Sequence, residues 1–251
     1  MNFINLAILT PTFNEAKNID LLLRELSMIS IQEHTVNFNV FVIDDSSPDG
    51  TSAVASSLAS TLKHTNFLIS VVNREKKEGL GKAYIDGFKS MLQLDNPPDF
   101  VLQMDADLSH SPKYIPQFIE AARGGADFVV GSRYIPGGSS PDWSWYRKLL
   151  SRGGNFYACS ILGRRIHDYT GGFNMYSIGL IRKMDVDSID YFGYGFLIDL
   201  KFRAARLAKK IVEVPIHFID REYGHSKMPA NTIINNFLLV PKIRFKSFIK
   251  P

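Results

Sequence analysis

Short apolar segments alternate with helical patterns over the first two-thirds of the chain. Apolar runs that stop at turn or acidic residues predict five strands, at residues 4–9, 36–43, 67–72, 99–104 and 128–131. Apolar residues at a spacing of three and four predict helices at residues 19–28, 51–62, 82–94 and from Pro112 onward. Alternating strands and helices are typical of βαβ units. The pattern therefore predicts an α/β fold with a mostly parallel sheet flanked by helices.

The sequence contains no internal repeat and no low-complexity linker, so it predicts one main domain. We place this domain at residues 1–230, with residues 143–162 as an inserted amphipathic helix. Residues 231–251 mix aromatic and basic side chains and are predicted to form a carboxy-terminal amphipathic helix. A length of 251 residues is enough for one large domain of this kind.

Composition and charge exclude several classes of protein. Hydrophobic residues make up 45% and charged residues 22%, which argues against a disordered chain. The single cysteine, Cys159, rules out an internal disulfide and favours a reducing compartment. The 29 basic and 25 acidic residues give a net charge of +4, with basic clusters at residues 147–152 and 242–250. We find no signal peptide and no uninterrupted apolar run of roughly 18 residues, so no segment is expected to cross a membrane.

Two acidic clusters follow predicted strands. Asp44 and Asp45 come after residues 36–43, and Asp105 and Asp107 come after residues 99–104. In open α/β sheets, ligands bind outside the carboxyl ends of the strands. Carboxylates placed there suit Mg²⁺ or Mn²⁺, which take their remaining ligands from phosphate and water. The alternative, that each Asp only forms a turn or a helix cap, becomes less attractive because two clusters share one sheet.

Other phosphate-binding and catalytic motifs are absent. The Gly79-Leu80-Gly81-Lys82 segment lacks the third glycine of a dinucleotide fingerprint, and the chain has no P-loop and no nucleophile elbow. His110, His167 and His225 are scattered, and we expect surface or hydrogen-bonded structural roles for them. Nucleic-acid binding is not expected, because basic residues lie beside acidic clusters and no recognition motif appears.

An ordered series of motifs resembles glycosyltransferase family 2 and, within it, the polyprenol-phosphate (dolichol-phosphate) mannose synthases. The motifs are PTFNE at 11–15, DDSSPDGT at 44–51, DADLSH at 105–110, GSRY at 131–134, SRGGN at 151–155, DYTGGF at 168–173, VPI at 214–216 and DREYGHSK at 220–227. Each motif alone is weakly specific, but the series covers nearly the whole chain in order.

The resemblance implies a GT-A fold and an inverting transfer of mannose from GDP-mannose to a polyprenyl or dolichyl monophosphate, assisted by Mg²⁺ or Mn²⁺. By resemblance, the donor nucleotide contacts Pro11, Asn14, Glu15, Asp45, Asp105, Ala106 and Lys227. The acceptor phosphate contacts Arg133, Arg147, Ser151 and Arg221, and the catalytic residues are Asp107, Arg133 and Arg221. Asp105 and Asp107 hold the metal, and Ser109 stands where some members have Gln. Asp199 stands where related enzymes often have Glu.

The physics of this reaction agrees with the basic residues. A phosphate monoester has its second pKa near 6 and is already largely ionised at neutral pH. Such a nucleophile needs to be held by guanidinium and ammonium groups more than it needs a base.

A lipid acceptor gives the two amphipathic helices a role at a membrane surface. We expect residues 143–162 and 231–251 to bind peripherally at the cytosolic face of a membrane, with Trp143, Trp145, Phe245 and Phe248 entering the interface. On pattern alone, packing of both helices against the core is equally good. An oligomer or a membrane-subunit partner is compatible with the sequence.

Three alternatives remain open from the sequence. The sugar nucleotide can be another one, such as UDP-glucose, since no residue is identified that reads the C2 hydroxyl. The acceptor can be a sugar hydroxyl, which would require a general base near the anomeric carbon. The chain can also be a catalytically silent sugar-nucleotide-binding protein, although the intact Asp105 and Asp107 argue against it.

Overall fold

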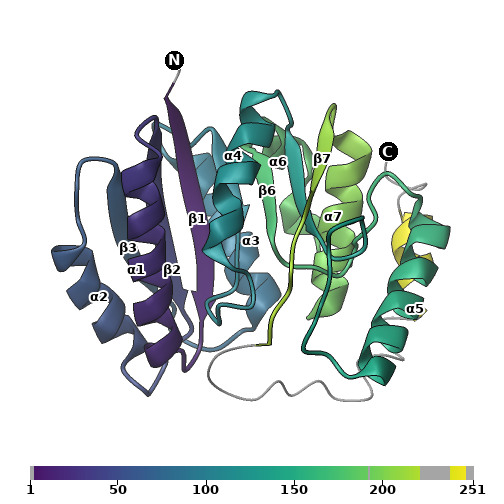
Figure 1. Ribbon diagram of the computed structural model, residues 1–251, viewed down its shortest axis with the longest axis horizontal. Helices are drawn as coiled ribbons and strands as arrows, with labels where there is room; N and C mark the ends of the chain where they lie inside the picture. The colour runs from purple at the N-terminus through teal and green to yellow at the C-terminus, as the bar shows by residue number, and fades with distance from the viewer. Residues whose placement is uncertain (1–2, 192, 221–237, 247–251) are drawn as a thin grey trace.

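The computed structural model describes residues 3–191, 193–220 and 238–246. In these residues a seven-stranded sheet has the order β3-β2-β1-β4-β6-β5-β7 (Figure 1). The strands are β1 Ile4–Thr12, β2 Val36–Asp44, β3 Phe67–Asn73, β4 Phe100–Gln103, β5 Phe128–Ser132, β6 Asn174–Ser177 and β7 Ile211–Pro215. Only β6 runs antiparallel to its neighbours, β4 and β5. The predicted mostly parallel sheet is confirmed.

Helices cover both faces of the sheet (Figure 1). They are α1 Ala16–Gln32, α2 Thr51–Thr61, α3 Leu80–Gln93, α4 Ile115–Arg123, α5 Trp145–Leu162, α6 Ile178–Lys183 and α7 Tyr194–Leu207, with short 3₁₀ turns η1 Pro112–Tyr114 and η2 Val186–Ser188. A further helix occupies residues 238–246. The five predicted strands and the helices between them are present, with ends shifted by a few residues.

Two hydrophobic cores form because successive side chains of a strand point to opposite faces. In β1, Leu6 and Ile8 pack with α1, α2 and α4, whereas Ala7 and Leu9 pack with α3, α6 and α7. Near-continuous apolar runs in β1, β2 and β5 follow from this burial on both sides. Both faces of the sheet are therefore covered by apolar packing, and polar residues gather at the ends of its strands.

The strand directions gather the predicted polar segments at one edge. Strands β1, β2 and β4 are parallel, and β5 points the same way because β6 is antiparallel to both β4 and β5. The carboxyl ends of β2, β4 and β5 lead to Asp44, Asp105 and Arg133. The amino end of β6 lies at the same edge and brings residues 168–173 there.

The predicted interface helix 143–162 needs a correction. The helix begins at Trp145, and Trp143 is buried, with its indole N–H donating to Asp220 at 3.1 Å and its ring against Phe218. Trp143 therefore does not enter a membrane interface as predicted, because the turn before α5 points it inward. Trp145, in contrast, is 78% exposed.

The described part of the predicted tail helix packs against the main domain. Val240 and Ile243 are buried in the same core as α7, while Leu238 and Phe245 are exposed. Residues 231–237 and 247–251, Phe248 among them, lie outside the described residues. Among the described residues, no helix is both long enough and apolar enough to span a bilayer.

Candidate active site

The ends of β1 and β2 are joined by a buried carboxylate. Asp44 accepts hydrogen bonds from the Thr12 hydroxyl at 2.7 Å, the Ser47 hydroxyl at 2.6 Å and the Ser47 backbone N–H at 2.8 Å. Asp44 is 1% exposed. It therefore fixes the turn after β2 and is not free to bind a ligand.

Its neighbour Asp45 forms an ion pair with Arg74, whose guanidinium also donates to Glu78 and Asp86 at 3.0 Å each. The backbone N–H of Gly79 donates to Asp45 at 3.3 Å. Asp45, a predicted nucleotide contact, thus anchors the loop before α3 at the carboxyl edge of the sheet.

Other predicted nucleotide residues lie in the adjoining β1–α1 turn. Pro11 pairs with Ile43 in the sheet register, so this turn lies beside the end of β2. Asn14 has a φ of +61°, and its N–H donates to the Ser47 hydroxyl at 2.9 Å. The N–H of Glu15 donates to the Thr51 hydroxyl at 2.9 Å. The structure therefore brings Pro11, Asn14 and Glu15 close to Asp45, which the β2–α2 loop carries.

The acidic pair follows β4 and is held by its own loop. Asp107 accepts hydrogen bonds from the Ser109 N–H at 3.1 Å and the Ser109 hydroxyl at 2.6 Å. Asp105 accepts one from the Tyr84 hydroxyl at 3.2 Å and retains a 32% exposed side chain. Ser109 thus orients the carboxylate of Asp107.

A buried histidine is hydrogen-bonded to the backbone of this loop. The Nδ1 atom of His110 accepts from the Asp105 backbone N–H at 3.0 Å, and its ring stacks on Phe173. Burial lowers the pKa of His110, which favours the neutral ring that this acceptor role requires. The expected hydrogen-bonded structural role is confirmed for His110. His167 hydrogen-bonds Glu213, and His225 lies outside the described residues.

The carboxylates of Asp105 and Asp107 fit a divalent cation that takes its remaining ligands from phosphate and water. No group of three or more His, Cys, Asp or Glu side chains in the described ranges could hold a metal ion by itself. Asp105 and Asp107 supply hard oxygen ligands on one short loop, and Mg²⁺ or Mn²⁺ commonly uses one or two carboxylates together with substrate phosphates. A cation here would therefore depend on a phosphorylated ligand.

At the end of β5, Arg133 forms a buried ion pair with Asp168. Its Nε and Nη2 atoms donate to the two carboxylate oxygens at 2.8 and 2.9 Å, and its backbone N–H donates at 3.1 Å. Burial alone would raise the pKa of Asp168, but the charges of Arg133 and Lys201 hold it well below its ordinary value. Asp168 therefore stays ionised and fixes the position of the Arg133 guanidinium.

Lys201 of α7 is a second cation behind this pair. Its side chain is fully buried, and its ammonium donates to the Gly171 carbonyl at 3.1 Å. Burial lowers the pKa of Lys201 from 10.5 to about 8, despite the attraction of Asp168.

Two glycines connect the acidic pair to Arg133. A side-chain carbon at Gly171 would lie 3.3 Å from an Asp168 oxygen, and one at Gly172 would lie 3.1 Å from His110 and 3.6 Å from an Asp105 oxygen. The backbone of residues 171–172 therefore fills the space between the Asp105 loop and the Asp168–Arg133 pair. The acidic and basic halves are therefore linked through this backbone.

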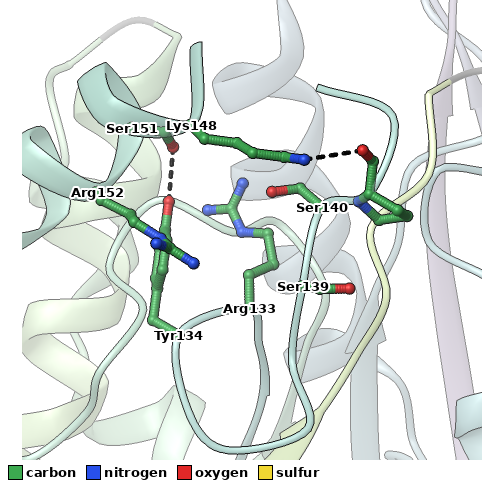
Figure 2. Close-up of a pocket in the computed structure, with 8 residues that line it drawn as sticks. Arg133, Tyr134, Ser139, Ser140, Lys148, Ser151 and Arg152 are labelled. Atoms are coloured by element: carbon green, nitrogen blue, oxygen red, sulfur yellow. Dashed lines mark hydrogen bonds between the residues drawn. The ribbon is translucent and has the colours of Figure 1, made fainter. Parts of the chain in front are cut away.

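Beside Arg133 lies a cavity of about 180 Å³ (Figure 2). Its lining residues are Arg133, Tyr134, Ser139, Ser140, Pro141, Lys148, Ser151 and Arg152. Figure 2 shows the Arg133 guanidinium directed toward the space between Lys148 and Arg152, and the Tyr134 and Ser151 hydroxyls are 2.6 Å apart. Three cations and several hydroxyls around a small cavity suit a phosphate group.

The cavity contains two of the predicted acceptor residues, Arg133 and Ser151, and the structure places Arg147 elsewhere. Arg147 pairs with Asp220 at 3.0 Å and stacks on Trp143. Arg221 and Lys227 lie outside the described residues. Sequence reasoning did not single out Lys148 and Arg152, although residues 148, 151 and 152 follow the i, i+3, i+4 spacing that places residues on one side of a helix. It also missed the partnership of Asp168 with Arg133 and Lys201, which no local pattern reveals.

A family profile and two relatives of named activity match most of the chain. The sequence profile of glycosyl transferase family 2 matches residues 7–185. An undecaprenyl-phosphate mannosyltransferase of Micrococcus luteus is 41% identical over 223 residues, which are 89% of this chain and 87% of that protein. A polyprenol monophosphomannose synthase of Mycolicibacterium smegmatis is 39% identical over 226 residues, or 90% and 82% of the two chains.

The fold is also found in solved structures. A mannosyltransferase from Pyrobaculum calidifontis, in complex with GDP-Man and Mn²⁺, superposes with a TM-score of 0.60 at 15% identity. The match covers 100% of this chain and 66% of that one. The expected GT-A architecture is confirmed at the level of the fold.

The buried charge of Lys201 predicts a pH dependence of stability. Between pH 8 and 10.5 the unfolded chain binds more protons at this lysine than the folded chain, so its contribution to the free energy of unfolding rises with pH. Replacement by Met removes this contribution. The free energy of unfolding of the wild type is therefore expected to rise relative to that of Lys201→Met by on the order of 1–3 kcal/mol between pH 7 and pH 10.

The measurement is urea unfolding of both proteins across this pH range. Lys209→Met, at an exposed lysine just after α7, serves as the control and should give a small difference that does not vary with pH. A constant gap between Lys201→Met and wild type would mean that Lys201 does not carry a depressed pKa.

Proposed function

The chain belongs to glycosyl transferase family 2, and we propose that it transfers mannose from GDP-mannose to a polyprenyl phosphate with inversion at the anomeric carbon. The observation that carries the proposal is the cavity beside Arg133, whose cations and hydroxyls suit a phosphate monoester. The names of the relatives in Micrococcus luteus and Mycolicibacterium smegmatis support the same acceptor class.

The donor lies, in this proposal, across the ends of β1, β2 and β4. Pro11, Asn14, Glu15 and Asp45 surround its nucleotide, and Asp105, Ala106 and Asp107 face its diphosphate. The solved mannosyltransferase in complex with GDP-Man and Mn²⁺ supports both this donor and a divalent cation. Either Mg²⁺ or Mn²⁺ fits the carboxylates, and it would offset charge that develops on the leaving diphosphate.

The acceptor phosphate lies in the cavity, held by Arg133, Lys148 and Ser151. It is largely ionised at neutral pH, so these residues orient an oxygen that is already nucleophilic. Attack on the anomeric carbon from the side opposite the diphosphate gives inversion in a single displacement. Arg133 is well placed for this task because Asp168 fixes its guanidinium before substrate arrives.

A general base is not needed for this reaction, and the carboxylate of Asp199 is paired with another side chain. Asp199 is 4% exposed, and its two oxygens accept from Arg203 at 3.2 and 3.0 Å. A hydroxyl acceptor would need a free carboxylate or histidine to remove its proton. The paired state of Asp199 favours the phosphate acceptor over the hydroxyl acceptor.

The enzyme reaches its lipid substrate, we infer, by peripheral binding at the cytosolic face of a membrane. The outer face of α5 exposes Trp145, Tyr146, Leu149, Leu150 and Phe156. Such a face beside basic residues is typical of helices that lie in a lipid interface. Leu238 and Phe245 of helix 238–246 add to the exposed apolar surface.

The direct test is product analysis. Purified protein is incubated with a short polyprenyl phosphate and, in parallel, GDP-mannose or UDP-glucose, and the lipid fraction is measured by mass spectrometry. We expect mannosyl phosphoryl polyprenol from GDP-mannose alone, with a β linkage by NMR. Glucosylated lipid, or transfer to an added sugar hydroxyl in preference to the phosphate, would contradict the proposal.

Removal of the divalent cation is expected to abolish transfer. Excess chelator should stop turnover, and added Mg²⁺ or Mn²⁺ should restore it. Asp107→Ala should lose at least ~100-fold in kcat while its circular dichroism and melting temperature stay close to wild type. Asp95→Ala, at an exposed acidic residue between α3 and β4, is the control. Full activity in chelator would show that the carboxylates act without a metal.

Loss of a cavity cation is expected to weaken the acceptor and not the donor. Lys148→Ala should raise KM for polyprenyl phosphate by roughly tenfold, since a charge-assisted contact contributes about 1.5–3 kcal/mol. KM for the donor should change by less than about twofold. Lys113→Ala, on the 3₁₀ turn η1 and outside the cavity, is the matched control. Equal effects on both substrates would place Lys148 outside the acceptor site.

A further inference from the structure

A second cavity adjoins the first and has no part in the reaction described above. It has a volume of about 440 Å³ and shares Tyr134 and Arg152 with the acceptor cavity. Its remaining lining residues are Asn155, Phe156, Cys159, Arg164 and His167. The cavity thus lies between α5 and the segment that follows it.

The charges around this cavity are of one sign. Arg152 and Arg164 are its charged lining residues, and none of its described lining residues is acidic. Arg152 and Arg164 form no ion pair within the described part of the chain, and the Arg164 guanidinium lies 5.7 Å from the centre of the Phe156 ring. His167 is held by Glu213, which does not line the cavity. The cavity is therefore complementary to an anion.

The rim of the cavity is apolar and continues along α5. Phe156 lies seven residues after Leu149 and eleven after Trp145, which is the spacing of one helical stripe. All three side chains are exposed, Phe156 at 63%. An occupant that matches both features has a phosphate group for the arginines and an apolar chain for the stripe.

We propose that this second cavity binds the phosphate of an anionic phospholipid, whose acyl chains lie along the apolar stripe of α5. The proposal rests on the membrane association proposed above, and it concerns a structural lipid that is distinct from the acceptor. A phospholipid held here would orient α5 on the bilayer so that the adjoining cavity meets the acceptor phosphate at headgroup depth. Arg164 is its most specific contact because it lines only the second cavity.

The test is vesicle flotation without donor or acceptor. The full-length protein is mixed with vesicles of phosphatidylcholine alone or of phosphatidylcholine with phosphatidylglycerol, and the bound fraction is measured. We expect binding to increase with phosphatidylglycerol. Arg164→Ala should reduce the partition coefficient on the anionic vesicles by at least about twentyfold. General attraction of a basic residue to an anionic surface contributes about 1 kcal/mol, or about fivefold, and a seated phosphate adds to it.

The chain offers a matched control in the next residue. Arg165 is also exposed, and its guanidinium donates to the carbonyls of Arg206 and Ala208. Arg165→Ala therefore removes the same charge as Arg164→Ala from a side chain that does not line the cavity. Arg165→Ala should reduce partition by no more than about fivefold, which is the general electrostatic contribution of one basic residue. Arg164→Lys should recover only part of the loss, because it keeps the charge without the two-pronged guanidinium. Equal losses for Arg164→Ala and Arg165→Ala would mean bulk electrostatics and would overturn the site.

Further measurements distinguish a lipid phosphate from free inorganic phosphate. They also distinguish the lipid site from the membrane association proposed above. Inorganic phosphate, added at constant ionic strength, should not release the protein from anionic vesicles; release would overturn the lipid in favour of a free anion. Equal flotation on both vesicle types would overturn the lipid site and leave the membrane interface standing. Absence of flotation on either would overturn both. Transfer to a short-chain acceptor in solution should be unchanged in Arg164→Ala, which separates this site from the acceptor cavity.

Discussion

The buried ion pair between Arg133 and Asp168 is the interaction on which the site depends. It joins the end of β5 to the segment that precedes β6, two places that are 35 residues apart in sequence. Both partners are buried, so removal of either would leave an uncompensated charge, at a cost of about 3–5 kcal/mol. The same pair directs a guanidinium toward the cavity and holds Gly171 and Gly172 against the Asp105 loop. Folding and chemistry therefore depend on one contact.

This arrangement divides the carboxyl edge of the sheet by charge. Carboxylates follow β2 and β4, whereas cations follow β5 and occupy α5. A nucleoside diphosphate with a divalent cation matches the first half, and a bare phosphate monoester matches the second. The backbone of residues 171–172 lies between the halves, and the absence of side-chain carbons there lets them approach closely. The sugar to be transferred would lie where the two halves meet.

The sequence was sufficient for the parts of this site that depend on strand direction. Asp45, Asp105 and Arg133 each follow a buried apolar run, and parallel strands must place such residues at one edge. The sequence did not predict β6, because this strand has only four residues and no alternation of apolar and polar positions. It therefore did not predict the position of Asp168, which lies in the segment before β6. Lys201 could not be identified either, because a lysine on a helix normally faces solvent and only the tertiary fold buries it. The predicted interfacial position of Trp143 was wrong for a related reason. Helical periodicity does not indicate the direction of a side chain in the turn before the helix.

A phosphate acceptor would account for the many cations and the scarcity of free bases among the described residues of the site. A hydroxyl nucleophile must lose a proton during attack, and a site for it would leave a carboxylate or an imidazole unpaired. Here Asp199 is bound to Arg203, His110 accepts from the backbone of Asp105, and His167 is bound to Glu213. A phosphate has already lost its protons, so its difficulty is the opposite one: two anions, acceptor and diphosphate, must approach each other. Cations fixed in advance by buried partners, as Arg133 is by Asp168, reduce that repulsion without reorganising during the reaction. The described part of the site is therefore better suited to bringing two phosphates together than to activating a hydroxyl.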